Sequence, residues 1–152
     1  MAQQASLTGV MSPHIGASLA RLVRKRAGNV CEYCCLPQSS QEATFHVDHI
    51  QPAVAQGLTT PDNLALACVT CSLRKAARTE ARDPRTKQLI RLFHPRRDCW
   101  AEHFGWTAGW RMVGRTPIGR ATVIALGMNR PAIIAIRRTL AALGRFPPRT
   151  RG

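Results

Sequence analysis

Two Cys-x-x-Cys pairs constrain the fold of this chain more than any other feature. They are Cys31 with Cys34, and Cys68 with Cys71. Each pair offers two thiolates from one tight turn, and two such pairs complete the tetrahedron of sulfur ligands that Zn²⁺ prefers. The paired spacing favours a zinc site over a coincidence of buried thiols. Because a four-cysteine site leaves no open position, we expect this zinc to hold the fold and to do no chemistry.

The charge of the chain indicates a polyanionic partner. Its 152 residues include 22 Lys plus Arg against 8 Asp plus Glu, a formal net charge of +14, and nineteen of the basic residues are Arg. Arginine binds phosphate oxygens through paired hydrogen bonds, so nucleic acid is the leading candidate. A structural protein of ribosomal type would also explain the charge. No apolar run is long enough to span a membrane and no secretory signal is evident, so we expect a cytoplasmic protein without a membrane partner.

Helix and turn signals divide the chain into four parts. These are a disordered N-terminus over 1–17, a zinc domain with a leading helix over 18–82, an extension over 83–145, and a basic tail over 146–152. The extension combines a hairpin with two helices, each starting with proline at its first position. In the last helix Ile133, Ile136, Leu140 and Leu143 form the apolar face, and Arg137 points elsewhere. We expect Trp100, Trp106 and Trp110 to pack against these helices in preference to stacking on bases.

Between the cysteine pairs, the sequence predicts a strand over 43–47 that exits over 49–52, and a helix over 71–80 follows the second pair. On an extended strand His46 and Asp48 share one face and His49 lies on the other. Asp48 offers a hard oxygen ligand, and a histidine beside it can serve as general base because this side chain titrates near neutral pH. Taken alone, these three residues are equally compatible with a polar surface.

The stretches CEYC, FHVDHIQP and DNLALACVTC together resemble the HNH endonuclease family, in its branch with a Cys₄ zinc site around a ββα-metal motif. The resemblance covers about residues 27–80. The later stretches LFHPRRDCWAEHFGW and TPIGRATVIALGMNRP are similar to an extension found in some bacterial members. The resemblance implies an α+β fold, with a zinc-stabilised ββα-metal core followed by a small hairpin and two helices.

The resemblance also implies metal-dependent hydrolysis of phosphodiester bonds in DNA. His49 would take a proton from the attacking water, and Asp48 would bind Mg²⁺ or another divalent cation. The cation would stabilise charge at the scissile phosphate and the leaving 3′ oxygen. Asn63 would orient His49 and support its loop. For His46 three roles stay open, namely a second cation ligand, a phosphate contact, or support of the strand.

One position departs from the family pattern. Ser72 stands where the family usually has the Asn or His that supplies the second cation ligand. A serine hydroxyl is shorter and a weaker ligand for Mg²⁺, so Ser72 either binds a cation through water or serves only as a helix N-cap. The nearby Arg74, Lys75 and Arg78 are predicted to contact nucleic acid. The alternative function is therefore a zinc-stabilised nucleic-acid-binding module with weak or no catalysis.

Overall fold

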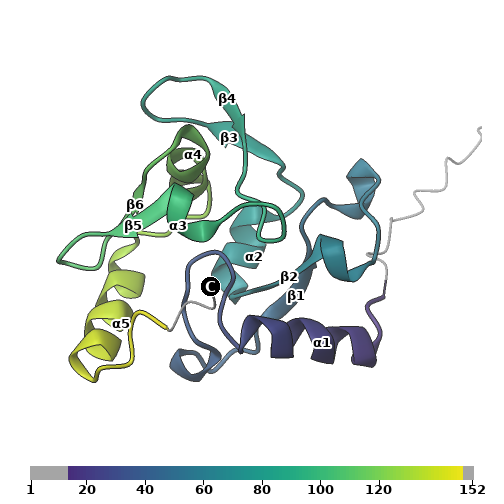
Figure 1. The fold of residues 1–152 in the computed structure, drawn as a ribbon, viewed down its shortest axis with the longest axis horizontal. Coiled ribbons are helices and arrows are strands. Elements are labelled where there is room, and N and C mark those ends of the chain that lie inside the picture. Colours follow the sequence, from purple (N-terminus) through teal and green to yellow (C-terminus); the bar gives the residue numbers. More distant parts are fainter. Residues whose placement is uncertain (1–13, 149–152) are drawn as a thin grey trace, which may run out of the picture.

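The computed structural model describes residues 14–148. Within this range the chain forms five α-helices and three two-stranded antiparallel sheets, an α+β fold as predicted (Figure 1). The predictions for residues 1–13 and for the end of the basic tail, 149–152, lie outside the described residues.

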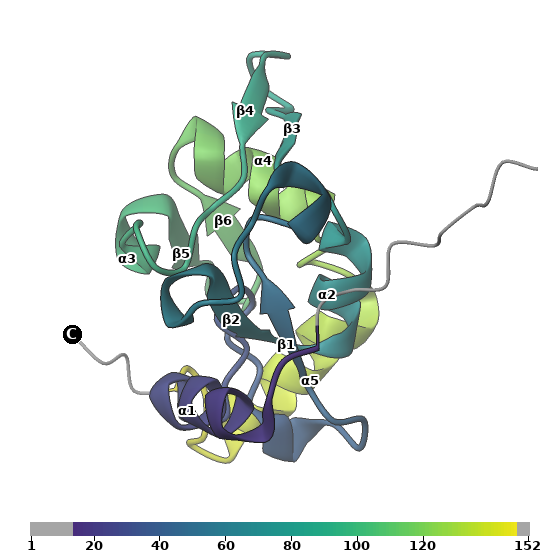
Figure 2. The same ribbon diagram turned by 90° about the vertical axis from the view of Figure 1, so that its right-hand side faces the viewer.

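The first half of the chain builds a strand hairpin with a helix packed on each of two sides. Its elements are α1 (Ala17–Ala27), β1 (His46–His49), β2 (Leu64–Ala67) and α2 (Val69–Lys75). Gly28 caps the C-terminus of α1 in the left-handed conformation, with φ 63°. The strands pair antiparallel with His46 opposite Ala67, and all four residues of β2 are buried. Figure 2 shows α1 and α2 against this hairpin.

Two predicted boundaries in this half are wrong for identifiable reasons. The strand does not begin at residue 43, because Phe45 makes its hydrogen bonds with the side chains of Gln38 and Arg24 and not with β2. The helix begins at Val69 and not at residue 71, because the Cys68 sulfur caps it by accepting from the Cys71 N–H. It ends at Lys75, where the chain turns to a positive φ.

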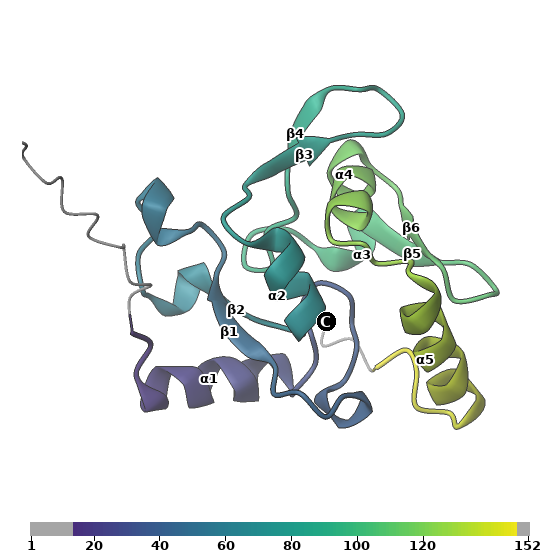
Figure 3. The same cartoon turned by 180° about the vertical axis from the view of Figure 1, so that it is seen from behind.

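The second half of the chain packs beside α2 (Figure 3). Its elements are β3 (Glu80–Arg82), β4 (Leu89–Arg91), α3 (Trp100–His103), β5 (Phe104–Trp106), β6 (Met112–Gly114), α4 (Pro117–Ala125) and α5 (Pro131–Ala142). The predicted hairpin corresponds to β5 and β6, preceded by the short α3, which the sequence analysis did not anticipate. As predicted, α4 begins with a proline, Pro117; the Thr116 side chain caps it by accepting from the Gly119 N–H, and Gly127 beyond its end is in the left-handed conformation.

The division drawn between residues 82 and 83 falls inside the hairpin that joins β3 to β4. Asp83 lies in the turn, fully buried, and binds the Arg120 guanidinium of α4 through two contacts of 2.8 and 2.9 Å. Hydrogen bonds from Arg120 hold the pKa of Asp83 well below its usual range. This ion pair fixes the hairpin to α4.

Aromatic side chains join the extension to the cysteine pairs. The Trp100 indole donates to the Tyr33 carbonyl at 3.1 Å, and Phe93 packs edge-on against Tyr33 and Phe104. The tryptophans pack on one another and on Phe146. Phe146 therefore anchors the start of the predicted tail in the core. Of the expected contacts with the two C-terminal helices, the structure shows that of Trp106 with Arg137 of α5.

The prediction for Arg137 is wrong, because this side chain lies on the inner face of α5 and is fully buried. Its guanidinium donates to the carbonyls of Met128 and Trp110 and lies 4.9 Å from the centre of the Trp106 ring. Burial lowers the pKa of Arg137, while the charge of Cys34, Cys35 and Cys71 opposes that shift. The apolar face of α5 is also shorter than predicted, since Leu143 is 62% exposed.

We predict that Arg137→Met destabilises the protein by about 2–6 kcal/mol, because it leaves the buried carbonyls of Met128 and Trp110 without a donor, at about 1–3 kcal/mol each. The free energy of unfolding in urea measures the loss. Arg138→Met is the matched control, because Arg138 is the next residue of α5 and is exposed. Equal effects of the two substitutions would contradict a specific role for the buried guanidinium.

Candidate functional site

The four cysteines of the two Cys-x-x-Cys pairs meet in the structure. Their sulfur atoms lie within 4.8 Å of one another and all four residues are buried. The Sγ atoms of Cys34 and Cys68 are 3.7 Å apart, close to the ~3.8 Å edge of a tetrahedron with Zn–S bonds of about 2.3 Å. Backbone N–H groups of Cys34 and Cys71 point at the sulfurs of Cys31 and Cys68. This cluster fits a structural Zn²⁺.

The chemistry of the cluster also favours a cation. Hydrogen bonding among the sulfurs lowers the pKa of Cys68 and, together with burial, raises the pKa of Cys34 and of Cys71 well above the ordinary value, so one thiolate is stabilised by neutral neighbours. Four thiolates therefore do not coexist in this space without a positive charge between them. A zinc ion supplies that charge and accepts all four sulfurs.

His49 is positioned by a residue that the sequence analysis did not identify. Its Nε2 lies 2.8 Å from the hydroxyl of Thr59, which stands in the loop between β1 and β2. Because this contact spans ten positions along the chain, no local pattern signals it. The other ring nitrogen, Nδ1, makes no hydrogen bond within residues 14–148.

Asn63 closes the loop that carries Thr59. Its side-chain oxygen accepts from the Gln51 N–H at 2.9 Å, and its Nδ2 donates to the carbonyls of Gln51 and Leu58 at 3.0 and 2.8 Å. The backbone carbonyl of Asn63 accepts from the Ile50 N–H. Asn63 thus holds both ends of the loop, and the direct partner of the His49 ring is Thr59.

Ser72 lies on the same side of the hairpin as His46. Its hydroxyl is 2.8 Å from Nδ1 of His46. The N-cap interpretation is wrong, because Ser72 lies inside α2 and its N–H donates to the Cys68 carbonyl, as in a regular helical turn. Asp48 is half-buried on β1, paired with Ala65.

Asp48 is not part of a ready-made group of three metal ligands within the described residues. Within residues 14–148, the cysteine cluster is the one group of three or more His, Cys, Asp or Glu side chains close enough together to hold a metal ion. A single carboxylate with waters suits Mg²⁺, which keeps much of its hydration and often binds together with substrate phosphates. Asp48 therefore fits a cation that arrives with, or is completed by, a phosphate ligand.

The three predicted nucleic-acid contacts on and after α2 have different surroundings. A Cβ at Gly127 would come within 2.9 Å of Arg74 Cζ, so the Arg74 guanidinium rests on the end of α4. Arg78 reaches the Ala125 carbonyl at 3.5 Å. Cations at a helix C-terminus offset its partial negative charge, so both arginines help to hold α4 against α2.

Lys75 is only 4% exposed, and its Nζ donates to the His49 carbonyl at 3.3 Å. Burial lowers the pKa of Lys75, and the charge of Asp48 opposes this shift. The ammonium group therefore lies within the electrostatic reach of the predicted cation ligand. Contact of these three basic residues with nucleic acid stays a prediction.

The fold and the cysteine cluster define an α+β domain with a four-cysteine site that fits zinc, and its strand β1 carries the sequence His-Val-Asp-His. Residues 31–78 match the family model of the HNH endonucleases, and the four cysteines fit the zinc-containing branch of that family. No curated protein and no solved structure matches the chain. The resemblance seen in the sequence is thereby confirmed for residues 31–78, and an HNH domain supports a nuclease or nucleic-acid-related function.

None of the helices in residues 14–148 has the length and hydrophobicity of a membrane span.

Proposed function

We propose that this protein is a metal-dependent endonuclease that hydrolyses phosphodiester bonds in DNA. The observation that carries the proposal is the His49 imidazole, held through Nε2 by Thr59, on the strand of an HNH domain that also bears Asp48. A hydrolytic site needs a base for the attacking water and a means of stabilising phosphate charge. We assign these two functions to His49 and Asp48. Successive strand residues point to opposite faces, so both side chains reach one phosphate only if the chain bends at the end of β1, where His49 is the last strand residue.

In the proposed reaction, Nδ1 of His49 takes a proton from a water molecule as its oxygen attacks phosphorus. The P–O3′ bond breaks, and the 3′ oxygen leaves and is protonated by solvent. Thr59 keeps the imidazole in one orientation, and Asn63 keeps Thr59 in place by closing the loop. Mg²⁺ bound by Asp48 would stabilise the charge that develops on the phosphate and the leaving oxygen.

A labelled DNA duplex incubated with the zinc-loaded protein and Mg²⁺ tests this reaction. The expected products carry a 3′-hydroxyl and a 5′-phosphate, because the bond to the 3′ oxygen is the one that breaks. Products with a 3′-phosphate would contradict the proposed direction of attack.

A nucleic-acid-binding module with weak or no catalysis is the second candidate. Two observations favour it: the Ser72 hydroxyl is engaged with His46, and within residues 14–148 Asp48 belongs to no group of three or more His, Cys, Asp or Glu side chains that could hold a cation. Binding of DNA without cleavage in Mg²⁺, Mn²⁺ or Ni²⁺ would support this candidate over the nuclease.

We predict that Ser72→Asn raises the cleavage rate about tenfold, equivalent to about 1.4 kcal/mol off the barrier. The longer amide side chain carries a carbonyl oxygen that extends farther from α2 than the serine hydroxyl, and so can ligate a cation held by Asp48. Rates of plasmid cleavage in Mg²⁺ measure the effect. Ser72→Ala is the control, because it removes the hydroxyl and keeps a helix-forming residue. A loss of activity in Ser72→Ala without a gain in Ser72→Asn would contradict the prediction and show that the serine hydroxyl itself contributes to cleavage.

A further inference from the structure

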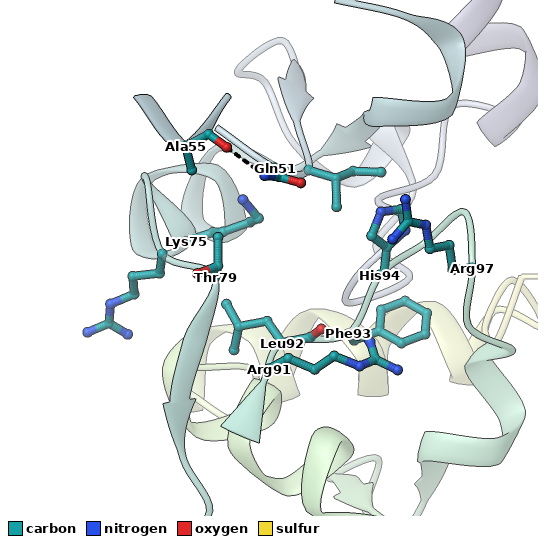
Figure 4. Close-up of a pocket in the computed structure, with 11 residues that line it drawn as sticks. Gln51, Ala55, Lys75, Thr79, Arg91, Leu92, Phe93, His94 and Arg97 are labelled. Atoms are coloured by element: carbon teal, nitrogen blue, oxygen red, sulfur yellow. Dashed lines mark hydrogen bonds between the residues drawn. The ribbon is translucent and has the colours of Figure 1, made fainter. Parts of the chain in front are cut away.

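A pocket of about 520 Å³ lies between the HNH domain and the extension (Figure 4). Three segments line it: the chain that follows β1, the end of α2 with the start of β3, and the chain from β4 to residue 97. Figure 4 shows Lys75 and Gln51 on one side of the space, with His94 and Arg97 across from them. Neither the HNH domain nor the extension forms this pocket alone.

The charge of the pocket is entirely basic. No Asp or Glu lines it, whereas five basic side chains do, namely Lys75, Arg78, Arg91, His94 and Arg97. Two of the arginines have protein partners: Arg91 forms a paired contact with Asp98 at 2.8 and 2.9 Å, and Arg78 donates to the Ala125 carbonyl. Lys75 and His94 each make one side-chain hydrogen bond within the protein. The guanidinium of Arg97 makes no hydrogen bond or ion pair within the part of the chain that the structure describes, so it is available to a ligand.

Lys75 presents unused hydrogen-bond donors at the pocket wall. An ammonium group has three donors, and the described residues give its Nζ a single acceptor, the His49 carbonyl at 3.3 Å. With only 4% of the residue exposed, water satisfies little of what remains. An anionic ligand would accept hydrogen bonds from the remaining donors and so stabilise this buried ammonium group.

The His94 ring offers a hydrogen-bond donor, the Nε2–H of its neutral form. Its Nδ1 accepts from the backbone N–H of Arg96 at 3.2 Å, which places the proton of the neutral ring on Nε2. Burial, aided by the charge of Arg97, lowers the pKa of His94. The loop itself is fixed, because the His94 N–H donates to Asp98, the carboxylate that also binds Arg91. His94 thus adds an N–H donor and no negative charge.

We propose that this pocket binds a phosphate group of the DNA strand next to the scissile phosphodiester, through Lys75, Arg97 and Nε2 of His94. The inference rests on the proposed function, and it assigns to the extension a direct part in substrate binding. The pocket adjoins the catalytic strand, since Lys75 bonds to the backbone of His49 itself. A phosphate held there would fix the strand relative to the His49 imidazole.

Binding of a short DNA duplex, measured by fluorescence anisotropy without added divalent cation, tests the proposal. We expect Arg97→Ala to weaken binding about tenfold and to reduce the slope of log K against log salt by about one, as loss of one phosphate contact does. His94→Ala should weaken binding, and His94→Gln, which keeps an N–H donor, should restore part of it. Arg85→Ala is the matched control, because Arg85 is exposed in the β3–β4 turn and does not line the pocket.

Inorganic phosphate is the second probe, followed through the His94 ring resonances. A shift in the wild type that is lost in Arg97→Ala, together with the DNA result, supports the assignment. A phosphate response without any effect of Arg97→Ala on DNA affinity would assign the pocket to a free phosphate compound and overturn the strand contact. Equal DNA affinities of Arg97→Ala and Arg85→Ala would likewise overturn it. Because binding is measured without cleavage, an inactive wild type would refute the nuclease and leave this test intact.

Discussion

Removal of zinc, or the substitution Cys71→Ala, will unfold the HNH domain. Structural zinc contributes about 10–16 kcal/mol of apparent binding free energy in small zinc domains, whereas a whole domain is stable by only about 5–15 kcal/mol. The cluster joins the Cys31–Cys34 turn to Cys68 and Cys71 at the start of α2. The buried strand β2 directly precedes Cys68 in the chain and belongs to the same hydrophobic core. Loss of one ligand therefore affects the packing of the entire hairpin.

Metal analysis and thermal unfolding followed by circular dichroism measure this effect. The wild type is expected to hold one zinc per chain and to unfold cooperatively, and Cys71→Ala to hold less than stoichiometric zinc and to lose its transition. Cys99→Ala is the matched control, since Cys99 is exposed and outside the cluster. A folded wild type without stoichiometric zinc would refute the zinc assignment.

His49→Ala will lower the rate of DNA cleavage by a factor on the order of 100 to 10,000, the usual contribution of a general base. The substitution removes Nδ1, which accepts the proton, and leaves Asp48 and the cysteine cluster in place. Affinity for DNA should change little, because His49 acts on water and not on the strand. The ratio of the two single-turnover rates at saturating protein measures the loss.

The control for His49→Ala is His14→Ala, which removes an exposed histidine just before α1. Zinc content and thermal unfolding of all variants show whether the fold is intact. A His49→Ala protein that is folded, binds DNA and cleaves it at the wild-type rate would contradict the assignment of the base.

The zinc ligands were predictable because two short local patterns fix both the residues and the geometry. The caps of α4 were predictable for the same reason, since proline and glycine act on their own backbone. Thr59 was not, because its contact with His49 depends on a loop closed by Asn63, and the sequence records no distance across that loop. The start of α2 was missed because a cysteine sulfur, which also belongs to the zinc cluster, serves as its cap.

Charge was the least reliable guide to position. Arg137 looks like a surface residue in a helical pattern, yet it fills the core beneath Trp106 because carbonyls of other segments accept hydrogen bonds from its two Nη atoms, while its buried Nε has no partner among the described residues. Lys75 similarly looks like an exposed contact and is buried at the pocket wall. In both cases the partners come from distant segments, and only the assembled fold brings them together.

The rate at which the zinc-loaded wild type nicks supercoiled plasmid in Mg²⁺ tests the central claim most directly. The account predicts cleavage that requires added Mg²⁺ and that is nearly abolished by His49→Ala. A wild type that binds the plasmid yet leaves it supercoiled in Mg²⁺, Mn²⁺ and Ni²⁺ would contradict the nuclease and leave a zinc-stabilised DNA-binding module.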